Sequence, residues 1–332
     1  MRALRFTAPR SARLVEHDRP TLHDGDALIA PHYVGLCGTD WELFTGSMPY
    51  FGQGLASYPL QPGHEVAGVV VESTDSGTPP GSRVMVDPVV GCGECPACHA
   101  GRQTHCAQRY ELGVRLAMPG GACDLVRVPT RNLHLVPDEV DLRDAALVEP
   151  GVTACHAVAR FGQAADRRAL VIGAGTLGLI AAQLLHSAGA VVDVLDVVPD
   201  RKPLIEELAA TPVTRVEQAR YDLVVEAAGS ATAVHDALTA VAPGGQIALI
   251  GVQGAPIDHV DVNTLVLNDA TLFGVLNGPG LYDVLLARLA EGAVATAPLI
   301  DQEYPLADAE HALARLANPA RTRPKVLLRV AG

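Results

Sequence analysis

The first 147 residues alternate short apolar stretches with Gly, Pro and polar residues. Stretches such as ALIAPHYVG, EVAGVVVE, SRVMVD and CDLVRVP have the length and the β-branched content of strands, and turn residues separate them. Many short strands without a sustained helical period between them are typical of a β-rich domain. We therefore predict such a domain over residues 1–147.

The pattern changes after Glu149-Pro150. GVTACHAVARF predicts a helix, and strand-length and helix-length segments then alternate through RALVI, TLGLIAAQLLHSAGA, VVDVLD, PLIEELAA, YDLVVEAAG, ATAVHDALTAVA, QIALIG and ATLFG. This alternation predicts a parallel sheet with helices on both faces. We expect residues 148–275 to form this doubly wound α/β domain.

The last part of the chain, residues 276–332, contains two more helical patterns and a closing strand pattern. The helices are expected in GLYDVLLARLAEG and ADAEHALARLAN, and the strand in KVLLRV. We predict that this tail returns to the β-rich domain, which would then combine residues 1–147 with residues 276–332.

Composition limits the choice of function. The chain has 332 residues, of which 48% are hydrophobic and 19% charged, and its formal net charge is −12. No apolar run approaches the roughly 20 residues of a membrane span, and the opening MRALRFTAPR lacks the apolar core of an export signal. Nucleic-acid binders usually present a basic face. We expect a cytoplasmic protein with neither a membrane nor a nucleic-acid partner.

A glycine-rich turn lies between the strand ALVI and the next helix. Its residues are Gly173, Ala174, Gly175, Thr176, Leu177 and Gly178. In such a GxGxxG turn the first glycine allows the tight turn, the second lets the pyrophosphate approach, and the third permits close helix packing. The helix N-terminus then offers free N–H groups to the phosphates. The context predicts a dinucleotide site.

Asp196 ends the next strand, 18 residues after Gly178. A carboxylate at this place accepts hydrogen bonds from the ribose hydroxyls and repels a 2′-phosphate, which favours NAD over NADP. Arg201 and Lys202 follow closely and are either phosphate contacts or cations on a helix surface.

Four cysteines in GCGECPACHAGRQTHC predict a metal-binding lobe over residues 91–107. They are Cys92, Cys95, Cys98 and Cys106. Four thiolates surround one zinc ion tetrahedrally and leave no position for substrate, so this zinc is expected to be structural. Iron–sulfur ligation and disulfides are the alternatives.

A second set of metal-ligating residues is spread along the chain. It comprises Cys37 in GLCGTD, His64-Glu65 in PGHEVAG and Glu149 in LVEPG. A catalytic zinc needs about three protein ligands of mixed type and one open position, and a cysteine, a histidine and either carboxylate meet this need. Each residue taken alone is commonly a buried packing residue, and spacing does not unite them.

These segments follow one another in the order CGTD, GHE, four-cysteine lobe, EP and GAGTLG. Together they resemble the zinc-containing medium-chain dehydrogenase/reductase family over essentially the whole chain. Glutamate rather than cysteine at position 149 is similar to its polyol, glucose and threonine dehydrogenase branch. The resemblance implies a GroES-like catalytic domain, a Rossmann domain and an NAD(P)-dependent zinc enzyme that oxidises CH–OH groups.

The resemblance also implies roles for single residues near the zinc. Cys37 and His64 match ligands of the catalytic zinc, and Glu65 and Glu149 match two carboxylates that bind the metal directly, through water or alternately. Asp40 matches the carboxylate that orients the ligating histidine, with a turn cap as the alternative.

Four further positions of the resemblance lie around the substrate and the nicotinamide. Thr39 matches the hydroxyl that touches the substrate oxygen, and Glu42 falls at the position of a proton relay. Thr153 and Phe273 align with positions near the nicotinamide.

The carboxylates around the zinc, together with Asn277, favour a hydroxyl-rich substrate such as a polyol, sugar, cyclitol or aminocyclitol. Alternatively, Asn277 caps the helix that follows it. We expect two zinc ions per chain, NAD as cofactor and, by analogy with relatives, a homo-oligomer. The competing interpretations are a zinc-independent quinone or enoyl reductase of the same fold, and a nucleotide-binding protein without catalysis.

Overall fold

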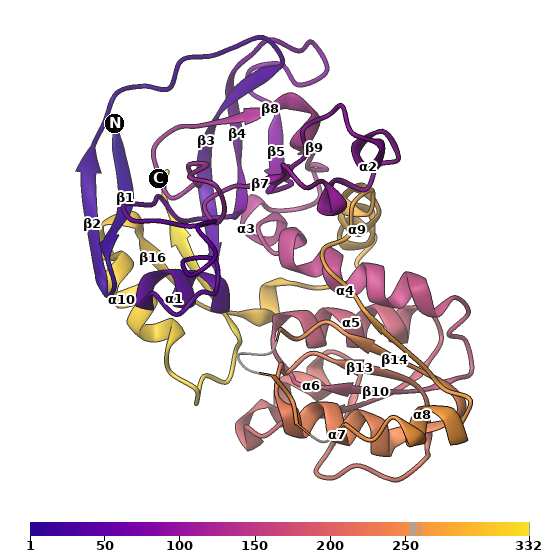
Figure 1. Cartoon of the computed structure of the whole chain (residues 1–332). Coiled ribbons are helices and arrows are strands. Elements are labelled where there is room, and N and C mark those ends of the chain that lie inside the picture. The colour runs from indigo at the N-terminus through magenta and orange to yellow at the C-terminus, as the bar shows by residue number, and fades with distance from the viewer. Residues whose placement is uncertain (253–255, 259, 332) are drawn as a thin grey trace.

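The computed structural model describes residues 1–252, 256–258 and 260–331. Figure 1 shows a β-rich part that holds both chain ends and an α/β part beside it. The fold class predicted from the sequence is confirmed. In the part of the chain that is described, no helix is both long and apolar enough to cross a membrane.

The β-rich part is built on a seven-stranded sheet with the order β16-β17-β3-β4-β5-β9, in which β8 also pairs with β3. Two small antiparallel pairs, β1-β2 and β6-β7, lie outside it. The strands are β1 (Arg2–Ala8), β2 (Ser11–Glu16), β3 (Asp26–Leu36), β4 (Glu65–Ser73), β5 (Arg83–Val86), β6 (Val89–Val90), β7 (Tyr110–Glu111), β8 (Val126–Pro129), β9 (Leu133–Leu135), β16 (Ile300–Pro305) and β17 (Lys325–Arg329).

The α/β part has a six-stranded parallel sheet with the order β12-β11-β10-β13-β14-β15. The order reverses between β10 and β13, and in such sheets ligands bind at the carboxyl ends of the strands at this point. The elements are β10 (Arg168–Ile172), α5 (Thr176–Ser187), β11 (Val191–Leu195), α6 (Lys202–Glu207), β12 (Thr211–Val213), β13 (Tyr221–Glu226), α7 (Ala231–Ala240), β14 (Val241–Leu249), α8 (Asn263–Leu267) and β15 (Thr271–Gly274).

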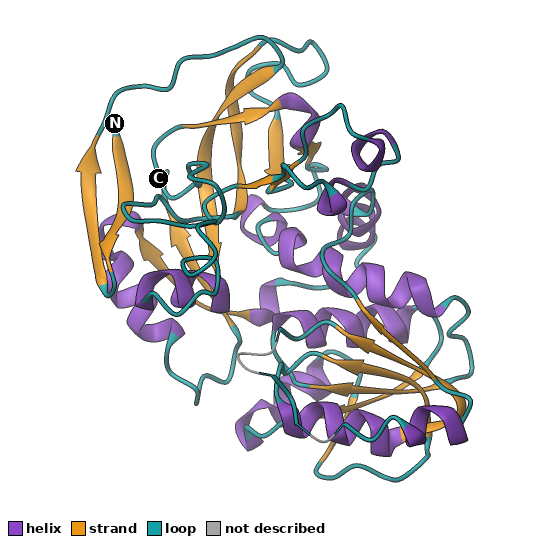
Figure 2. Cartoon of the chain, viewed as in Figure 1, coloured by secondary structure: helices purple, strands orange, loops and turns teal. Residues whose placement is uncertain are grey.

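Alternate residues of the central strand β10 enter two different cores, because successive side chains of a strand point to opposite faces. Ala169 and Val171 join the core under α5, whereas Leu170 and Ile172 join the core under α7. Helices therefore cover both faces of the sheet, as Figure 2 shows.

The helix α4 (Val148–Phe161) connects the two parts and packs on α5 and on α9 (Tyr282–Ala290). After α9 the chain continues through β16 and α10 (Ala309–Leu316) to β17, which lies antiparallel to β3. The helix begins at Val148, three residues earlier than its sequence pattern indicates. This difference places Glu149 in its first turn.

Several short elements were not anticipated from the pattern: the helices α1 (Gly38–Thr45), α2 (Pro96–His99), α3 (Leu142–Ala145) and α8, and the strands β6, β7, β9, β12 and β16. The helix α1 contains Gly, Thr and two aromatic residues and is only two turns long, so its helical period is weak. A capping box between Cys37 and Asp40 starts it instead. The strand β16 has a polar sequence and pairs only with β17, because it is an edge strand.

Candidate functional site

Cys37 lies where β3 ends and α1 begins. It is the N-cap of α1, and its backbone N–H donates to Asp40 Oδ2 at 3.0 Å. The backbone N–H of Thr39 approaches Cys37 Sγ at 3.3 Å. The cap fixes the thiol at the end of the sheet, partly exposed to solvent.

His64 immediately precedes β4 and brings its ring to Cys37. Its Nε2 lies 3.2 Å from Cys37 Sγ, and its Nδ1 lies 3.6 Å from Asp40 Oδ1. Burial lowers the pKa of His64, but Cys37 and Asp40 outweigh this effect and raise it well above the usual value. Gly63 has a φ of 102°, and a Cβ there would lie 2.8 Å from the backbone nitrogen of Ala122. Glycine is thus required for the turn that presents His64.

Glu65 is fully buried and forms an ion pair with Lys325, the first residue of β17. The lysine Nζ lies 2.7 Å from both carboxylate oxygens and donates to the carbonyl of Leu36 at 3.3 Å. The carboxylate fills the place beside Gly35, where a Cβ would lie 1.8 Å from Glu65 Oε2. The pair joins β3, β4 and β17 beside the residue that precedes Cys37.

Glu149 approaches the same group from the first turn of α4. Burial raises the pKa of Glu149 to about 8; the charge of His64 opposes this rise and that of Glu65 adds to it. No hydrogen bond or ion pair of this carboxyl is found within the described parts of the chain. Glu149 is therefore available for a cation that enters the site.

The donor set fits zinc. Sγ of Cys37, Nε2 of His64 and a carboxylate oxygen of Glu65 lie within 4.8 Å of one another. Ligands of a tetrahedral zinc with one sulfur and one nitrogen lie roughly 3.5 Å apart, close to the observed 3.2 Å. The charges of Asp40 and Cys37 favour a positive charge on His64. The structure shows Asp40 as a cap of α1, and its Oδ1 lies 3.6 Å from His64 Nδ1, so its role in orienting the histidine stays a prediction.

Thr39 and Glu42 stand one turn apart on α1. Both side chains are half-buried, and burial raises the pKa of Glu42. Residues separated by three positions face the same side of a helix. The carboxyl group of Glu42 therefore lies on the same face of α1 as the hydroxyl of Thr39.

The four clustered cysteines also converge. The sulfurs of Cys92, Cys95, Cys98 and Cys106 lie within 4.8 Å of one another. Sγ of Cys92 and Sγ of Cys98 are 3.9 Å apart, far longer than a disulfide and close to the ~3.8 Å between two thiolates on one zinc. All seven cysteines of the chain are free thiols. Backbone N–H groups of Glu94 and Cys95 lower the pKa of Cys92 to about 6, which favours the metal-binding thiolate.

The glycine-rich turn has the expected geometry. Gly173 has a φ of 104°, and a Cβ on Gly178 would lie 1.9 Å from the carbonyl oxygen of Gly173. Gly175 is the N-cap of α5 and has open space where a Cβ would project. No side chain caps the N-terminus of α5, which begins with Thr176 and Leu177. The first backbone N–H groups of the helix are therefore free to bind a phosphate.

Asp196 closes this turn from the end of β11. Its carboxylate accepts from the backbone N–H of Ala174 at 2.6 Å and of Val198 at 2.7 Å. Arg201 Nη1 lies 3.1 Å from Asp196 Oδ2, so Arg201 is a paired, largely buried cation instead of a helix-surface residue. Lys202 is exposed.

The remaining predicted residues lie on α4 and after β15. Thr153 is half-buried one turn after Glu149, and the ring of Phe273 packs on Phe161 with Arg160 at 4.0 Å above it. Asn277 does not cap α9, which begins five residues later. Its side chain is buried and hydrogen-bonded to the hydroxyl of Tyr282.

Comparisons with known proteins point to one family. Residues 23–138 match the alcohol dehydrogenase GroES-like domain, and residues 145–321 match the glucose dehydrogenase C-terminus. L-galactonate-5-dehydrogenase of Escherichia coli K12 is 29% identical over 92% of each chain. The 2-dehydro-3-deoxy-L-galactonate 5-dehydrogenase of Pseudoalteromonas atlantica is 30% identical over 96% of each chain.

The chain belongs to the zinc-containing medium-chain dehydrogenase/reductase family. It is an oxidoreductase of the alcohol dehydrogenase type. Among solved structures, a protein described as a zinc-binding dehydrogenase of Sinorhizobium meliloti 1021, bound to NADP, superposes with a TM-score of 0.90. The two are 26% identical, and the match covers 99% of this chain and 98% of the other.

Sequence reasoning missed two partners of the site in this medium-chain dehydrogenase. Lys325 reaches Glu65 from 260 residues away, and Tyr282 links Asn277 to Asp87 Oδ1 at 3.0 Å. The sequence holds lysine only at positions 202 and 325. The lysine at the start of the closing strand, ahead of the apolar residues VLL, was the one available signal.

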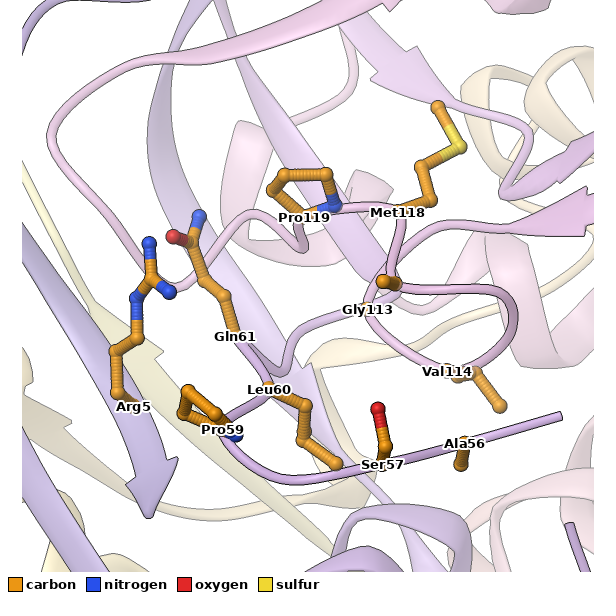
Figure 3. A pocket seen from close by; sticks show the side chains of 11 residues that line it. Arg5, Ala56, Ser57, Pro59, Leu60, Gln61, Gly113, Val114, Met118 and Pro119 are labelled. Atoms are coloured by element: carbon orange, nitrogen blue, oxygen red, sulfur yellow. The ribbon is translucent and has the colours of Figure 1, made fainter. Parts of the chain in front are cut away.

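A small cavity elsewhere in the β-rich part is not a substrate site. It measures about 50 Å³ and is lined by Arg5, Ser57, Gln61 and Met118 among others, as Figure 3 shows. A space of this size holds a few water molecules. The side chain of Gln61 already donates to the carbonyl of Gly120 at 2.6 Å.

Proposed function

We propose that this dehydrogenase oxidises a secondary hydroxyl group of a polyol or sugar-like substrate, and reduces the corresponding ketone, with NAD(H) as hydride carrier. The approach of Cys37 Sγ to His64 Nε2 at 3.2 Å, with the carboxyl groups of Glu65 and Glu149 beside them, carries the proposal, since a mixed donor set of this kind suits a catalytic zinc. Two relatives are named for galactonates, which are hydroxylated sugar acids, and support a hydroxyl-rich substrate over a simple alcohol.

Two zinc ions per chain are part of the proposal, one structural at the four cysteines and one catalytic. When bound, the catalytic zinc supplies Lewis-acid activation of the hydroxyl oxygen, and the nicotinamide accepts the hydride. Cys37 and His64 hold the metal. Glu65 lies close to them, but Lys325 occupies both of its oxygens, so we favour Glu149 as the third ligand.

The chain's own residues orient the metal ligands and remove the proton. Asp40 holds the backbone of Cys37 and faces Nδ1 of His64, so that Nε2 points to the metal. The hydroxyl of Thr39 accepts the proton of the substrate hydroxyl and gives its own proton to the carboxylate of Glu42, which releases it to water. Thr153 and Phe273 line the place of the nicotinamide.

NAD rather than NADP is proposed because Asp196 stands where the adenosine ribose meets the glycine-rich turn. Arg201 balances part of its charge, and the NADP in the related structure shows that a relative accepts the phosphorylated cofactor. Comparing kcat/KM with the two cofactors tests this preference directly.

Two further properties complete the proposal. Free cysteines that serve as metal ligands suit a reducing compartment, which supports a cytoplasmic location. The edge strand β15 supports assembly into a homo-oligomer through that side of the α/β part.

The experiment combines metal analysis with a substrate panel of polyols, cyclitols, aminocyclitols and sugar acids, assayed with NAD and NADP. We expect two zinc ions per wild-type chain and one in Cys37→Ala. Activity should fall by at least about 10³-fold in this variant, while NADH binding stays within about threefold. Cys155→Ala, which removes a buried thiol of α4 outside both clusters, is the matched control.

Full turnover by Cys37→Ala or by metal-depleted protein would contradict the proposal and favour a zinc-independent reductase. Binding of NADH without turnover of any compound in the panel would favour a nucleotide-binding protein without catalysis. Iron in place of zinc at the four cysteines would show in the same metal analysis.

A further inference from the structure

Glu226 is a fully buried carboxyl group that the proposed reaction does not use. It is the last residue of β13, which lies next to β10 where the strand order of the parallel sheet reverses. The carboxyl ends of these two strands border the crevice in which such sheets bind dinucleotides. A buried carboxyl group at this place needs hydrogen-bond donors, and the donors that it finds show what it holds.

One carboxylate oxygen of Glu226 fixes the turn that follows β13. Its Oε1 accepts from the backbone N–H of Ala228 at 2.9 Å and from that of Gly229 at 2.7 Å. Gly229 has a φ of 65°, and a Cβ there would lie 2.6 Å from the carbonyl oxygen of Val252. The turn after β13 therefore packs closely on the segment after β14, and only glycine fits at this contact.

The backbone of Glu226 holds the segment after β14 as well. Its carbonyl oxygen accepts from the backbone N–H of Ile250 at 2.9 Å and from that of Gly251 at 3.1 Å. The other carboxylate oxygen, Oε2, has no hydrogen-bond partner among the described residues. A Cβ on Gly251 would lie 2.8 Å from it. Oε1 thus makes the bonds of the side chain, and Glu226 joins the segments that leave β13 and β14.

The turn after β13 lies directly against the glycine-rich turn. A Cβ on Gly173 would lie 3.0 Å from the backbone nitrogen of Ala228. The backbone N–H of Ala227 donates to the carbonyl of Ile172, the last residue of β10, at 2.9 Å. A shift of Ala227 or Ala228 would therefore move the wall on which the first glycine of the dinucleotide motif rests.

Two helices, α5 and α7, begin at this crevice and differ in the N–H groups that they offer (Figure 1). No side chain caps α5. Ser230 caps α7, since its Oγ accepts from the backbone N–H of Ala233 at 3.2 Å, and Glu226 binds two N–H groups of the turn just before this cap. Because a phosphate needs free N–H groups, this difference directs the pyrophosphate to α5.

We propose that Glu226 is a positioning residue for the dinucleotide. It fixes the turn after β13 against the glycine-rich turn and keeps the N–H groups of Ala228 and Gly229 directed away from the pyrophosphate. The inference rests on the NAD-dependent function proposed above and deepens it. Glu226 acts through the turn, because its side chain is 0% exposed and does not reach a ligand. The hydrogen bonds to Oε1 carry this role, and the negative charge does not.

Two conservative variants separate the hydrogen bonds from the charge. Glu226→Gln keeps an acceptor oxygen and loses the charge, whereas Glu226→Asp keeps the charge and withdraws both oxygens by one methylene group. We expect the Kd of NADH to stay within about threefold of wild type in Glu226→Gln and to rise at least about tenfold in Glu226→Asp. Fluorescence titration of the zinc-loaded protein with NADH measures it.

Steady-state kinetics with the best substrate of the panel gives a second measure. The KM for NAD should rise in Glu226→Asp together with the Kd of NADH. The kcat at saturating NAD should stay within about threefold of wild type in both variants, because Glu226 contacts neither the metal ligands nor the substrate.

Asp193 provides a matched control, because it is a buried acid of the same sheet. Its Oδ2 accepts from the hydroxyl of Tyr221, the first residue of β13, at 2.9 Å, so it lies toward the other end of that strand. Asp193→Ala should lower the melting temperature and leave the Kd of NADH within about threefold of wild type.

Three results would overturn the inference. An unchanged Kd of NADH in Glu226→Asp would show that the turn does not depend on Oε1. A rise in Glu226→Gln equal to that in Glu226→Asp would assign the effect to charge, and an equal rise in Asp193→Ala would assign it to overall stability. A wild-type protein that binds no NADH would instead overturn the proposed function.

Discussion

At the scale of single residues, the buried pair of Glu65 and Lys325 is the least replaceable contact beside the metal site. The two side chains are 0% and 2% exposed, and the ammonium lies 2.7 Å from both carboxylate oxygens. Removing one partner of a buried pair leaves an unpaired charge, which costs about 3–5 kcal/mol. The pair also keeps Glu65 from adding a net negative charge behind Cys37 and His64.

We therefore predict that Lys325→Met lowers the melting temperature by roughly 5–10 °C. The double variant Glu65→Gln, Lys325→Met should recover much of this loss, because no buried charge remains. Lys202→Met, at the other lysine of the chain, is exposed and serves as the control. Differential scanning calorimetry on the zinc-loaded protein measures all three, and equal melting temperatures for wild type and Lys325→Met would contradict the prediction.

The same residues show how far the sequence leads. Cys37, His64 and the four lobe cysteines were predicted from residue type and order, and the structure brings both sets together. Lys325 was not predicted, because the pairing of β17 with β3 places it there and no local pattern reports such pairing. Arg201 was predicted to be a surface cation or a phosphate contact. Its ion pair with Asp196 was not predicted, because it depends on side-chain orientation.

At the scale of elements, two glycines of the glycine-rich turn serve different purposes: one allows helix packing and the other allows a pyrophosphate to approach. A Cβ on Gly178 meets the carbonyl oxygen of Gly173 at 1.9 Å, whereas a Cβ on Gly175 meets nothing within 4 Å. Gly178 is needed for α5 to pack on β10. Gly175 is needed only when a pyrophosphate occupies the open space.

We predict different outcomes for alanine at these positions. Gly175→Ala should keep the melting temperature of the nucleotide-free protein within a few degrees and weaken NADH binding at least about tenfold. Gly178→Ala should lower both stability and binding. Calorimetry and NADH fluorescence titration measure the two properties. Loss of stability in Gly175→Ala equal to that in Gly178→Ala would contradict this division of roles.

The helix α1 shows why short elements escape prediction. Thr39, Asp40 and Glu42 received their roles from a family resemblance, while the sequence pattern indicated no helix there. Tertiary placement after β3 and the reciprocal cap of Cys37 and Asp40 stabilise these two turns more than intrinsic propensity does. The segments that form α4, α5 and α7 were predicted, because they are long and their apolar residues repeat with a helical period.

At the scale of the whole molecule, the α/β part exposes several apolar side chains on α8 and in the segments after β14 and β15. The exposed fractions are 83% for Val252, 77% for Val266, 84% for Leu267 and 60% for Leu276. Val266 and Leu267 belong to α8, Val252 follows β14 and Leu276 follows β15, and among the described strands β15 is an edge strand paired with β14. An open strand edge beside exposed apolar side chains is a surface that proteins usually cover.

The proposed homo-oligomer covers this surface with a second copy of the chain, because two identical edges extend into one continuous sheet across a twofold axis. We predict that the wild-type protein sediments as a dimer or tetramer and that Leu267→Glu shifts it to smaller species, since a buried carboxylate opposes association. Val191→Glu changes an apolar side chain, 55% exposed, at the start of β11 and should leave the assembly intact. Analytical ultracentrifugation distinguishes these outcomes. A monomeric wild type, or a Leu267→Glu variant that keeps the wild-type mass, would show that another surface or none holds copies together.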